Sequence, residues 1–237
     1  MDFSKIIEQL QRTYYSELLM LCAEFTALII GLVYVRKDKA GQLFIAYIAF
    51  DFCILLADLF FMSNTSTTKK FNSDFISTTN TLVAFVELLV YFHYFRKILK
   101  GDKIKNILTG LTLIFSAIII VFLTTRFSFV TNRYNYISYM AGTIEFIFLL
   151  FPCIFYFLQL FKTNSLLPLT HRPSYWIVTG IFFYSLVSIP YYLLNKYFIN
   201  IQYESRHIFD AVFYYIPFAV NFIFLIKAFL CKKTLTI

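Results

Sequence analysis

Charged and chemically reactive side chains are scarce in this chain. Only 14% of its 237 residues are charged and 59% are hydrophobic, a balance far from that of a soluble domain. Its three histidines, His93, His171 and His207, lie far apart and belong to different predicted segments, so they cannot converge as the ligands of a membrane zinc hydrolase. The sequence has no HExxH motif, nucleophile elbow or Gly-rich phosphate loop. These absences exclude a water-soluble fold and the common catalytic constellations.

Cysteine and glycine are also few. The four cysteines include no CxxC pair, so neither a disulfide framework nor a zinc site is indicated. Six glycines give little means of breaking helices at mid-membrane, and no internal repeat joins two halves of the chain, as it does in many secondary transporters. The few glycines and the missing repeat count against a small carrier. We expect no cofactor, and the sequence assigns no metal ligands.

What the sequence does contain is long hydrophobic runs. They form seven blocks of about 20 residues, the length that an α-helix rising ~1.5 Å per residue needs to cross ~30 Å of hydrocarbon. They lack the alternation of a transmembrane β-strand. The sequence therefore predicts an all-α, multi-pass bundle of seven transmembrane helices at 17–35, 43–62, 75–95, 107–124, 137–161, 175–194 and 207–230. If the count is wrong, we expect the error in the short fourth block or in the N-terminal leader.

Residues 15–231 are expected to form a single transmembrane domain. Residues 1–14 have either the spacing of a short amphipathic helix at the membrane interface or simply the character of a polar leader. Residues 232–237 would be a short basic tail. The chain is thus predicted to belong to a cell membrane, with the lipid bilayer as its surroundings.

Lysine and arginine indicate the orientation of the bundle. Twelve of them fall on the side of the odd-numbered loops and the C-terminus, against eight on the other side. Cytoplasmic loops retain an excess of these residues, so we expect the N-terminus outside and the C-terminus in the cytoplasm. The third loop supplies much of the excess, and we expect it to face a cytoplasmic partner through Arg96, Lys97, Lys100, Lys103 and Lys105. The net charge of +8 suits anionic lipid headgroups, and nothing indicates nucleic acid binding.

Carboxylates are the informative anomaly in the hydrophobic blocks. Six of them fall there: Glu24, Asp51, Asp58, Glu87, Glu145 and Asp210. An Asp at a helix centre costs ~2.5–3.5 kcal/mol on insertion scales, so the acids should face a shared interior. Tyr91, Tyr214 and Asn221 share helical faces with them. The sequence predicts a polar interior seam made by these nine residues.

Two hypotheses explain this seam. The acids are either neutral and hydrogen-bonded to the many tyrosines, or they line an outward-facing negative cavity for a proton, a metal cation or a cationic small molecule. The basic groups His93 and Lys227 lie toward the opposite end of their blocks, and we expect Lys227 to extend to the cytoplasmic headgroups. Neither is placed to neutralise the outer acids.

Prolines distinguish the last three blocks from the first four. Pro152, Pro190 and Pro217 lie within blocks five, six and seven, whereas the first four blocks contain none. Each proline removes a backbone hydrogen bond and can kink its helix. The C-terminal helices are thus candidates for hinges, with packing alone as the alternative role.

Three segments carry a resemblance to a known group of proteins. They are Asn80 with 87–92, the segment 172–180 leading to Tyr184, and Asn221 with 228–232. They resemble uncharacterised bacterial seven-helix membrane proteins, some of which are similar to the input modules that accompany histidine kinases. The resemblance implies a bacterial inner-membrane sensor without an output domain, and it supplies no ligand or catalytic residue. Lys227 departs from the usually apolar residue at its position.

Three classes of function stay open. The first is a sensor or receptor-like module that relays occupancy of the acidic cavity to a cytoplasmic signalling protein. The second is a small proton- or cation-coupled transporter or channel, which the excess of acids would suit. The third is an intramembrane enzyme, for which the sequence shows no nucleophile, base or metal constellation.

Overall fold

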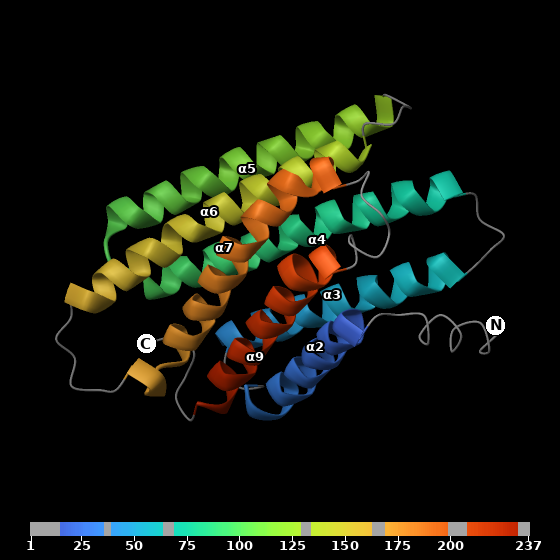
Figure 1. Ribbon diagram of the computed structural model, residues 1–237. Coiled ribbons are helices and arrows are strands. Elements are labelled where there is room, and N and C mark those ends of the chain that lie inside the picture. Colours follow the sequence, from blue (N-terminus) through green and yellow to red (C-terminus); the bar gives the residue numbers. More distant parts are fainter. Residues whose placement is uncertain are drawn as a thin grey trace.

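The computed structural model describes residues 15–35, 39–63, 69–128, 134–162, 169–198 and 208–231. All the regular structure in these ranges is helical. The predicted leader at 1–14 and the tail at 232–237 lie outside the described residues. The helices run side by side, and successive long helices point in opposite directions (Figure 1).

Most of the long helices extend beyond the hydrophobic blocks of the sequence at both ends. The long helices are α2 (Tyr15–Tyr34), α3 (Lys39–Ser63), α4 (Lys69–Ile98), α5 (Asp102–Ser128), α6 (Tyr134–Lys162), α7 (Pro173–Phe198) and α9 (Ile216–Leu230), with a short 3₁₀ helix η1 (Leu169–His171) and a π-helix η2 (Ala211–Tyr215). Polar ends continue the helical hydrogen bonding past the apolar segment that hydropathy detects.

Four helices identify the chain as an α-helical membrane protein. Asp102–Val121, Gly142–Lys162, Pro173–Leu194 and Ile208–Leu230 are each long and apolar enough to cross a bilayer. The first of these is the fourth hydrophobic block, where we expected any error in the count. Leu18–Tyr34 and Gly41–Ala57 are apolar but shorter over the described side chains. The seven crossings and their orientation stay predictions.

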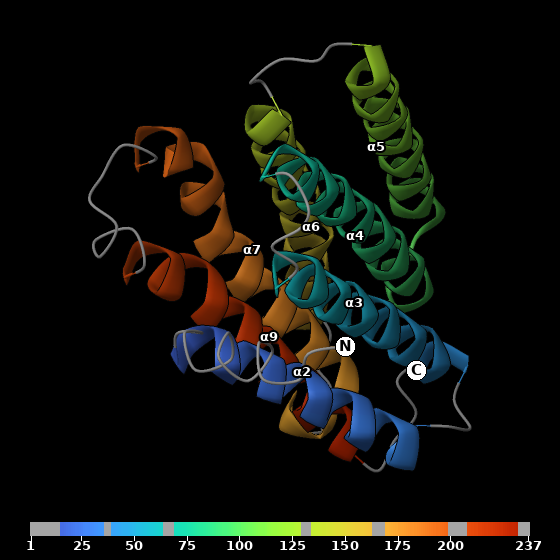
Figure 2. The same cartoon turned by 90° about the vertical axis from the view of Figure 1, so that its right-hand side faces the viewer.

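Six helices close a ring, and α5 lies outside it. Around the ring, each helix packs against the next in the order α2, α3, α4, α6, α7, α9 and back to α2. Helix α5 packs along α4 and α6, at the edge of the bundle (Figure 2). Only 17% of Asp102–Val121 is buried, against 44% of Pro173–Leu194. The interior of the ring is therefore the part of the molecule in which a site can form.

One end of the bundle is defined by the turn between α4 and α5, Leu99–Gly101, and we call it the turn end. Gly101 has φ = 105°, a conformation that favours glycine. Gln159 of α6 holds the turn at two points, because Lys100 N donates to Gln159 Oε1 at 3.0 Å and Gln159 Nε2 donates to Lys100 O at 2.8 Å. The third loop of the sequence is therefore mostly helical, with only three residues outside α4 and α5.

The half of the bundle nearer this turn, the turn half, has a dense aromatic core. Phe44, Tyr94 and Phe95 are at most 1% exposed, and the rings of Phe44 and Tyr94 meet edge to face with centroids 5.1 Å apart. Leu99, Leu149 and Phe222 are equally buried. Such burial is typical of a close-packed protein interior.

Prolines lie within the C-terminal helices, and a π-helix that the sequence did not predict precedes α9. Pro152 lies inside α6 and Pro190 inside α7. Pro217 lies in the first turn of α9, directly after η2. Because Pro217 has no N–H, the carbonyl one turn earlier lacks its α-helical partner, which accounts for a wider π turn at this position.

Candidate functional site

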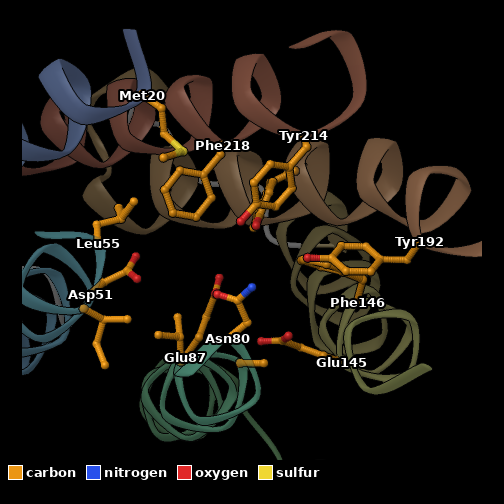
Figure 3. A pocket seen from close by; sticks show the side chains of 14 residues that line it. Met20, Asp51, Leu55, Asn80, Glu87, Glu145, Phe146, Tyr192, Tyr214 and Phe218 are labelled. Carbon is orange, nitrogen blue, oxygen red and sulfur yellow. The ribbon is translucent and has the colours of Figure 1, made fainter. Parts of the chain in front are cut away.

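A cavity of about 80 Å³ lies inside the helix ring, from the middle of the bundle toward the end opposite the turn. Every helix of the ring contributes to it and α5 does not. Its lining residues are Met20, Asp51, Ile54, Leu55, Asn80, Val83, Ala84, Glu87, Glu145, Phe146, Tyr184, Tyr192, Tyr214 and Phe218. The polar members point into it (Figure 3). By volume it accommodates a few water molecules or a very small ligand.

Three carboxylates from three helices form one side of the cavity, which we call the acidic wall: Asp51 of α3, Glu87 of α4 and Glu145 of α6. They are 4%, 3% and 2% exposed. Glu87 and Glu145 lie within electrostatic range of each other and of Asp51. Among the described residues that line the cavity there is no Lys, Arg or His. The described lining of the cavity therefore supplies no basic side chain to the acidic wall.

The hydrogen bonding of the two glutamates is incomplete. The Tyr47 hydroxyl bonds to the Glu87 carboxyl group. The remaining oxygen, Glu87 Oε1, has no partner among the described residues, and neither has Glu145 Oε1. A buried carboxyl oxygen without a partner is energetically costly. The hypothesis that tyrosines satisfy the acids thus holds for one oxygen of Glu87 and fails for the other and for Glu145 Oε1.

Aromatic rings form much of the remaining lining, which we call the aromatic wall: Phe146, Tyr184, Tyr192, Tyr214 and Phe218. Tyr214 and Phe218 lie across the cavity from Asp51 and Glu87, whereas Phe146 and Tyr192 lie beside Glu145 (Figure 3). Neighbouring rings of this wall contact one another. Phe146 meets Tyr184 at 4.9 Å and Tyr192 at 5.4 Å, and Tyr184 meets Phe218 at 5.4 Å between centroids. Most of this wall comes from α7, η2 and α9, whereas the acids come from α3, α4 and α6.

A glycine makes room for one ring of this wall. A Cβ at Gly142 of α6 would lie 2.6 Å from Tyr192 Cε1. The Tyr192 ring therefore lies directly on the α6 backbone, three residues before Glu145. This close approach fixes the aromatic wall beside the acidic wall.

About one helical turn from the lining residues Glu87 and Phe218, toward the turn end, a hydrogen bond joins α4 and α9, and we call this pair the floor. Asn221 Nδ2 donates to the Tyr91 hydroxyl at 3.1 Å, and both side chains are at most 4% exposed. Gly180 of α7 lies against this pair, because a Cβ there would be 2.8 Å from Asn221 Oδ1. The aromatic core of the turn half lies next to this pair, because the rings of Tyr91 and Phe44 are in contact with centroids 6.0 Å apart.

The structure brings together most of the predicted seam. Asp51, Glu87, Glu145 and Tyr214 line the cavity, and Tyr91 and Asn221 form its floor. Glu24 is fully buried on α2 within electrostatic range of Asp51, but it does not reach the cavity, and neither of its oxygens has a described partner. Asp210 is half-buried and outside the lining. The side chain of Asp58 lies outside the described residues.

Sequence reasoning missed the aromatic wall. Acids stand out in a hydrophobic block, whereas rings do not, in a chain with 21% aromatic residues. The one available signal was helical spacing: Tyr184 and Tyr192 are eight residues apart, so they share a face of α7. Met20 and Phe146 had no distinguishing pattern.

The basic residues gather around the turn, away from the cavity. Arg96 and Lys97 lie in the last turn of α4, Lys100 lies in the turn itself, and Lys103 lies in the first turn of α5; all four are exposed. Lys105 is half-buried in the next turn of α5. The basic groups and the acidic wall therefore occupy different parts of the molecule.

The two basic groups within the hydrophobic blocks also lie away from the acids. His93 borders an apolar groove between α3, α4 and α5. Lys227 is exposed, with Nζ 5.8 Å from the centroid of the Trp176 ring. Neither neutralises a carboxylate of the acidic wall, as the sequence indicated.

Comparisons with protein-family models, curated proteins and solved structures find no match to this chain. The fold and the cavity define its class: an α-helical membrane protein with an acidic and aromatic site inside a ring of helices. The resemblance to input modules of histidine kinases stays a prediction, and function is argued from the site alone.

Proposed function

We propose that this chain is a multi-pass membrane sensor of the receptor type. A small cationic ligand or ion would occupy the cavity, and the helices of the aromatic wall would transmit its presence to the turn end. The observation that supports this most is the difference between the two halves of the helix ring. An acidic cavity lies in one half, and a buried aromatic core lies in the other. In a bacterial inner membrane, with seven crossings, the cavity would face outward and the turn end would be cytoplasmic.

The relay would run through α7 and α9. Both helices extend from the aromatic wall to the turn end, and Pro190 and η2 interrupt them beside the cavity. A cation drawn between the two walls would pull these helices toward α3, α4 and α6. Helices with broken hydrogen-bond ladders bend at lower cost than continuous ones.

At the turn end this movement would reach a contact between the two helices. Trp176 of α7 stacks on Phe224 of α9 with centroids 5.8 Å apart, lies under Lys227, and donates from Nε1 to Thr170 O at 2.8 Å. Trp176 is the only tryptophan of the chain. A shift of α9 along α7 would change its surroundings, so its fluorescence reports the proposed relay.

The output would be a cytoplasmic signalling protein with an acidic surface. The exposed basic residues around the turn are charged groups beside a fixed backbone, since Gln159 holds Lys100 at both its N–H and its carbonyl. Electrostatic complementarity of this kind favours fast and selective association.

The second candidate is a small proton- or cation-coupled transporter. The unpartnered oxygens of Glu87 and Glu145 favour it, because buried carboxyl groups carry protons in many transporters. Transport also needs a route to the other side, and the turn half offers none among the described residues in this conformation. For this reason the sensor is our first proposal.

Proteoliposomes distinguish the two candidates. The sensor predicts no proton or sodium flux above that of empty vesicles, and a change in Trp176 emission when a cation enters the cavity. The transporter predicts flux that disappears in Glu87→Gln. Asp102→Asn, which neutralises an exposed carboxylate at the start of α5, is the matched control. Flux that depends on Glu87 would replace the sensor with the transporter.

A further inference from the structure

The acidic wall calls for a positive charge that brings hydrogen-bond donors. Glu87 Oε1 and Glu145 Oε1 are buried, point into the cavity and lack partners among the described residues (Figure 3). Carboxylates in an apolar interior are stable when they are paired with an opposite charge and accept hydrogen bonds. The occupant of the cavity should supply both.

The carboxylates do not form the close cluster that a metal ion requires. Within the described residues, no three His, Cys, Asp or Glu side chains converge at metal-ligand distances. Divalent metals in proteins draw several oxygen donors into one shell at ~2–2.6 Å. The acidic wall instead spreads its three carboxylates over three helices along one side of the space.

The aromatic wall completes the chemical description. Its five rings border the same cavity as the acids. Aromatic rings attract organic ammonium ions through the negative charge of their faces, at centroid distances within ~6 Å, and also contact the carbon atoms of such ions. A bare metal ion would leave this wall without a role in binding.

We infer that the cavity binds a small organic amine in its ammonium form, between the carboxylates of the acidic wall and the rings of the aromatic wall. The N–H groups of the ammonium would bond to Glu87 and Glu145, and its carbon atoms would contact Tyr192, Tyr214 and Phe218. A volume of about 80 Å³ fits only a few non-hydrogen atoms. This inference rests on the proposed cationic occupant and names its chemical class.

The test is isothermal titration calorimetry on the purified full chain in detergent, with dimethylammonium chloride as the probe. Sodium chloride and calcium chloride are titrated in parallel. We expect heat of binding from dimethylammonium alone, and a dissociation constant raised about tenfold or more by Glu145→Gln. Asp102→Asn is the matched carboxylate control and should change the constant less than about twofold.

A second pair of variants tests the rings. Tyr214→Leu should weaken dimethylammonium about tenfold, whereas Tyr214→Phe, which keeps the ring, should stay within about threefold of the wild type. Tyr34→Leu is the matched control, because Tyr34 is 64% exposed on α2 and away from the cavity. Tyr214→Leu and Tyr214→Phe change the same residue and are compared with each other. A folding defect in Glu145→Gln therefore does not affect this comparison.

The outcomes separate this inference from the sensor proposal. Binding of sodium or calcium that depends on Glu145, without binding of dimethylammonium, would overturn the amine and leave a metal-sensing receptor. Absence of binding by all three probes would overturn it as well, and so would equal affinities of Tyr214→Leu and Tyr214→Phe. Binding of dimethylammonium with the expected variant effects, but with no response of Trp176, would support the amine and count against the relay.

Discussion

The two halves of the helix ring are built from similar residues and differ in how far the hydrogen bonds of their buried polar groups are satisfied. In the turn half, the buried hydroxyl of Tyr156 bonds to Ser174 Oγ at 3.0 Å, and the rings of Phe44, Tyr91 and Tyr94 fill the space between helices. In the half with the cavity, similarly aromatic helices enclose a space of about 80 Å³, and Glu87 Oε1 and Glu145 Oε1 are buried beside it without partners among the described residues.

The difference shows how a membrane bundle separates stability from function. Inside a bilayer, helices associate through close packing and hydrogen bonds, because lipid already solvates apolar side chains. The turn half meets this requirement. The other half retains a void, and one carboxyl oxygen each of Glu87 and Glu145 has no partner among the described residues. Such features lower stability and are retained where a ligand binds. Substitutions should therefore act in opposite directions on the two halves.

The largest effect is expected from Phe44→Ala in the turn half. Phe44 is fully buried, and its removal leaves a cavity where three rings now meet. The free energy of unfolding should fall by about 3 kcal/mol, at the low end for Phe→Ala because transfer to water contributes little in lipid. Unfolding in mixed micelles, followed by Trp176 fluorescence, measures this. Phe183→Ala is the control, because Phe183 is 41% exposed; equal losses would refute a packed turn half.

The next effect concerns Gly180, at the boundary between the halves. Gly180→Ala should lower the free energy of unfolding by about 1–3 kcal/mol, because the new Cβ meets Asn221 Oδ1 at 2.8 Å and Phe224 Cβ at 2.9 Å. Gly110→Ala is a matched control, since a Cβ there has nothing within 4 Å, and it should stabilise α5 by about 0.5–1 kcal/mol. A neutral Gly180→Ala would show that α7 and α9 are not held closely here.

A smaller effect is expected at the floor of the cavity. Tyr91→Phe removes the hydroxyl that accepts from Asn221 Nδ2 and leaves this donor buried. The free energy of unfolding should fall by about 1–2 kcal/mol, the usual cost of an orphaned neutral donor. Tyr34→Phe, at an exposed position, should have no effect. No change in Tyr91→Phe would indicate that water enters the floor and replaces the hydroxyl.

Hydropathy predicted the helical membrane class, because long apolar runs depend only on composition along the chain. It also indicated that acids face inward, since a carboxylate in lipid is too costly to tolerate, and Asp51, Glu87 and Glu145 do so. Hydropathy could not predict which helices pack against each other. The packing of α4 on α6, with α5 outside the ring, depends on the shapes of side chains on different helices. For the same reason the sequence could list the acids, but it could not show that Glu24 lies outside the cavity lining or that Tyr192 packs on α6 beside Glu145.

The smallest effect on stability, with the opposite sign, is expected from Glu145→Gln in the half with the cavity. The substitution keeps the shape of the side chain and removes a carboxyl group whose Oε1 has no partner, so the free energy of unfolding should stay within about 1 kcal/mol of the wild type or rise. Asp102→Asn in the exposed start of α5 is the matched control and should have no effect. The same mixed-micelle unfolding provides the measurement. A loss of 3 kcal/mol or more would mean that Glu145 is a structural partner, and the contrast between a sealed half and a ligand-binding half would fail, since a site residue should cost stability rather than supply it.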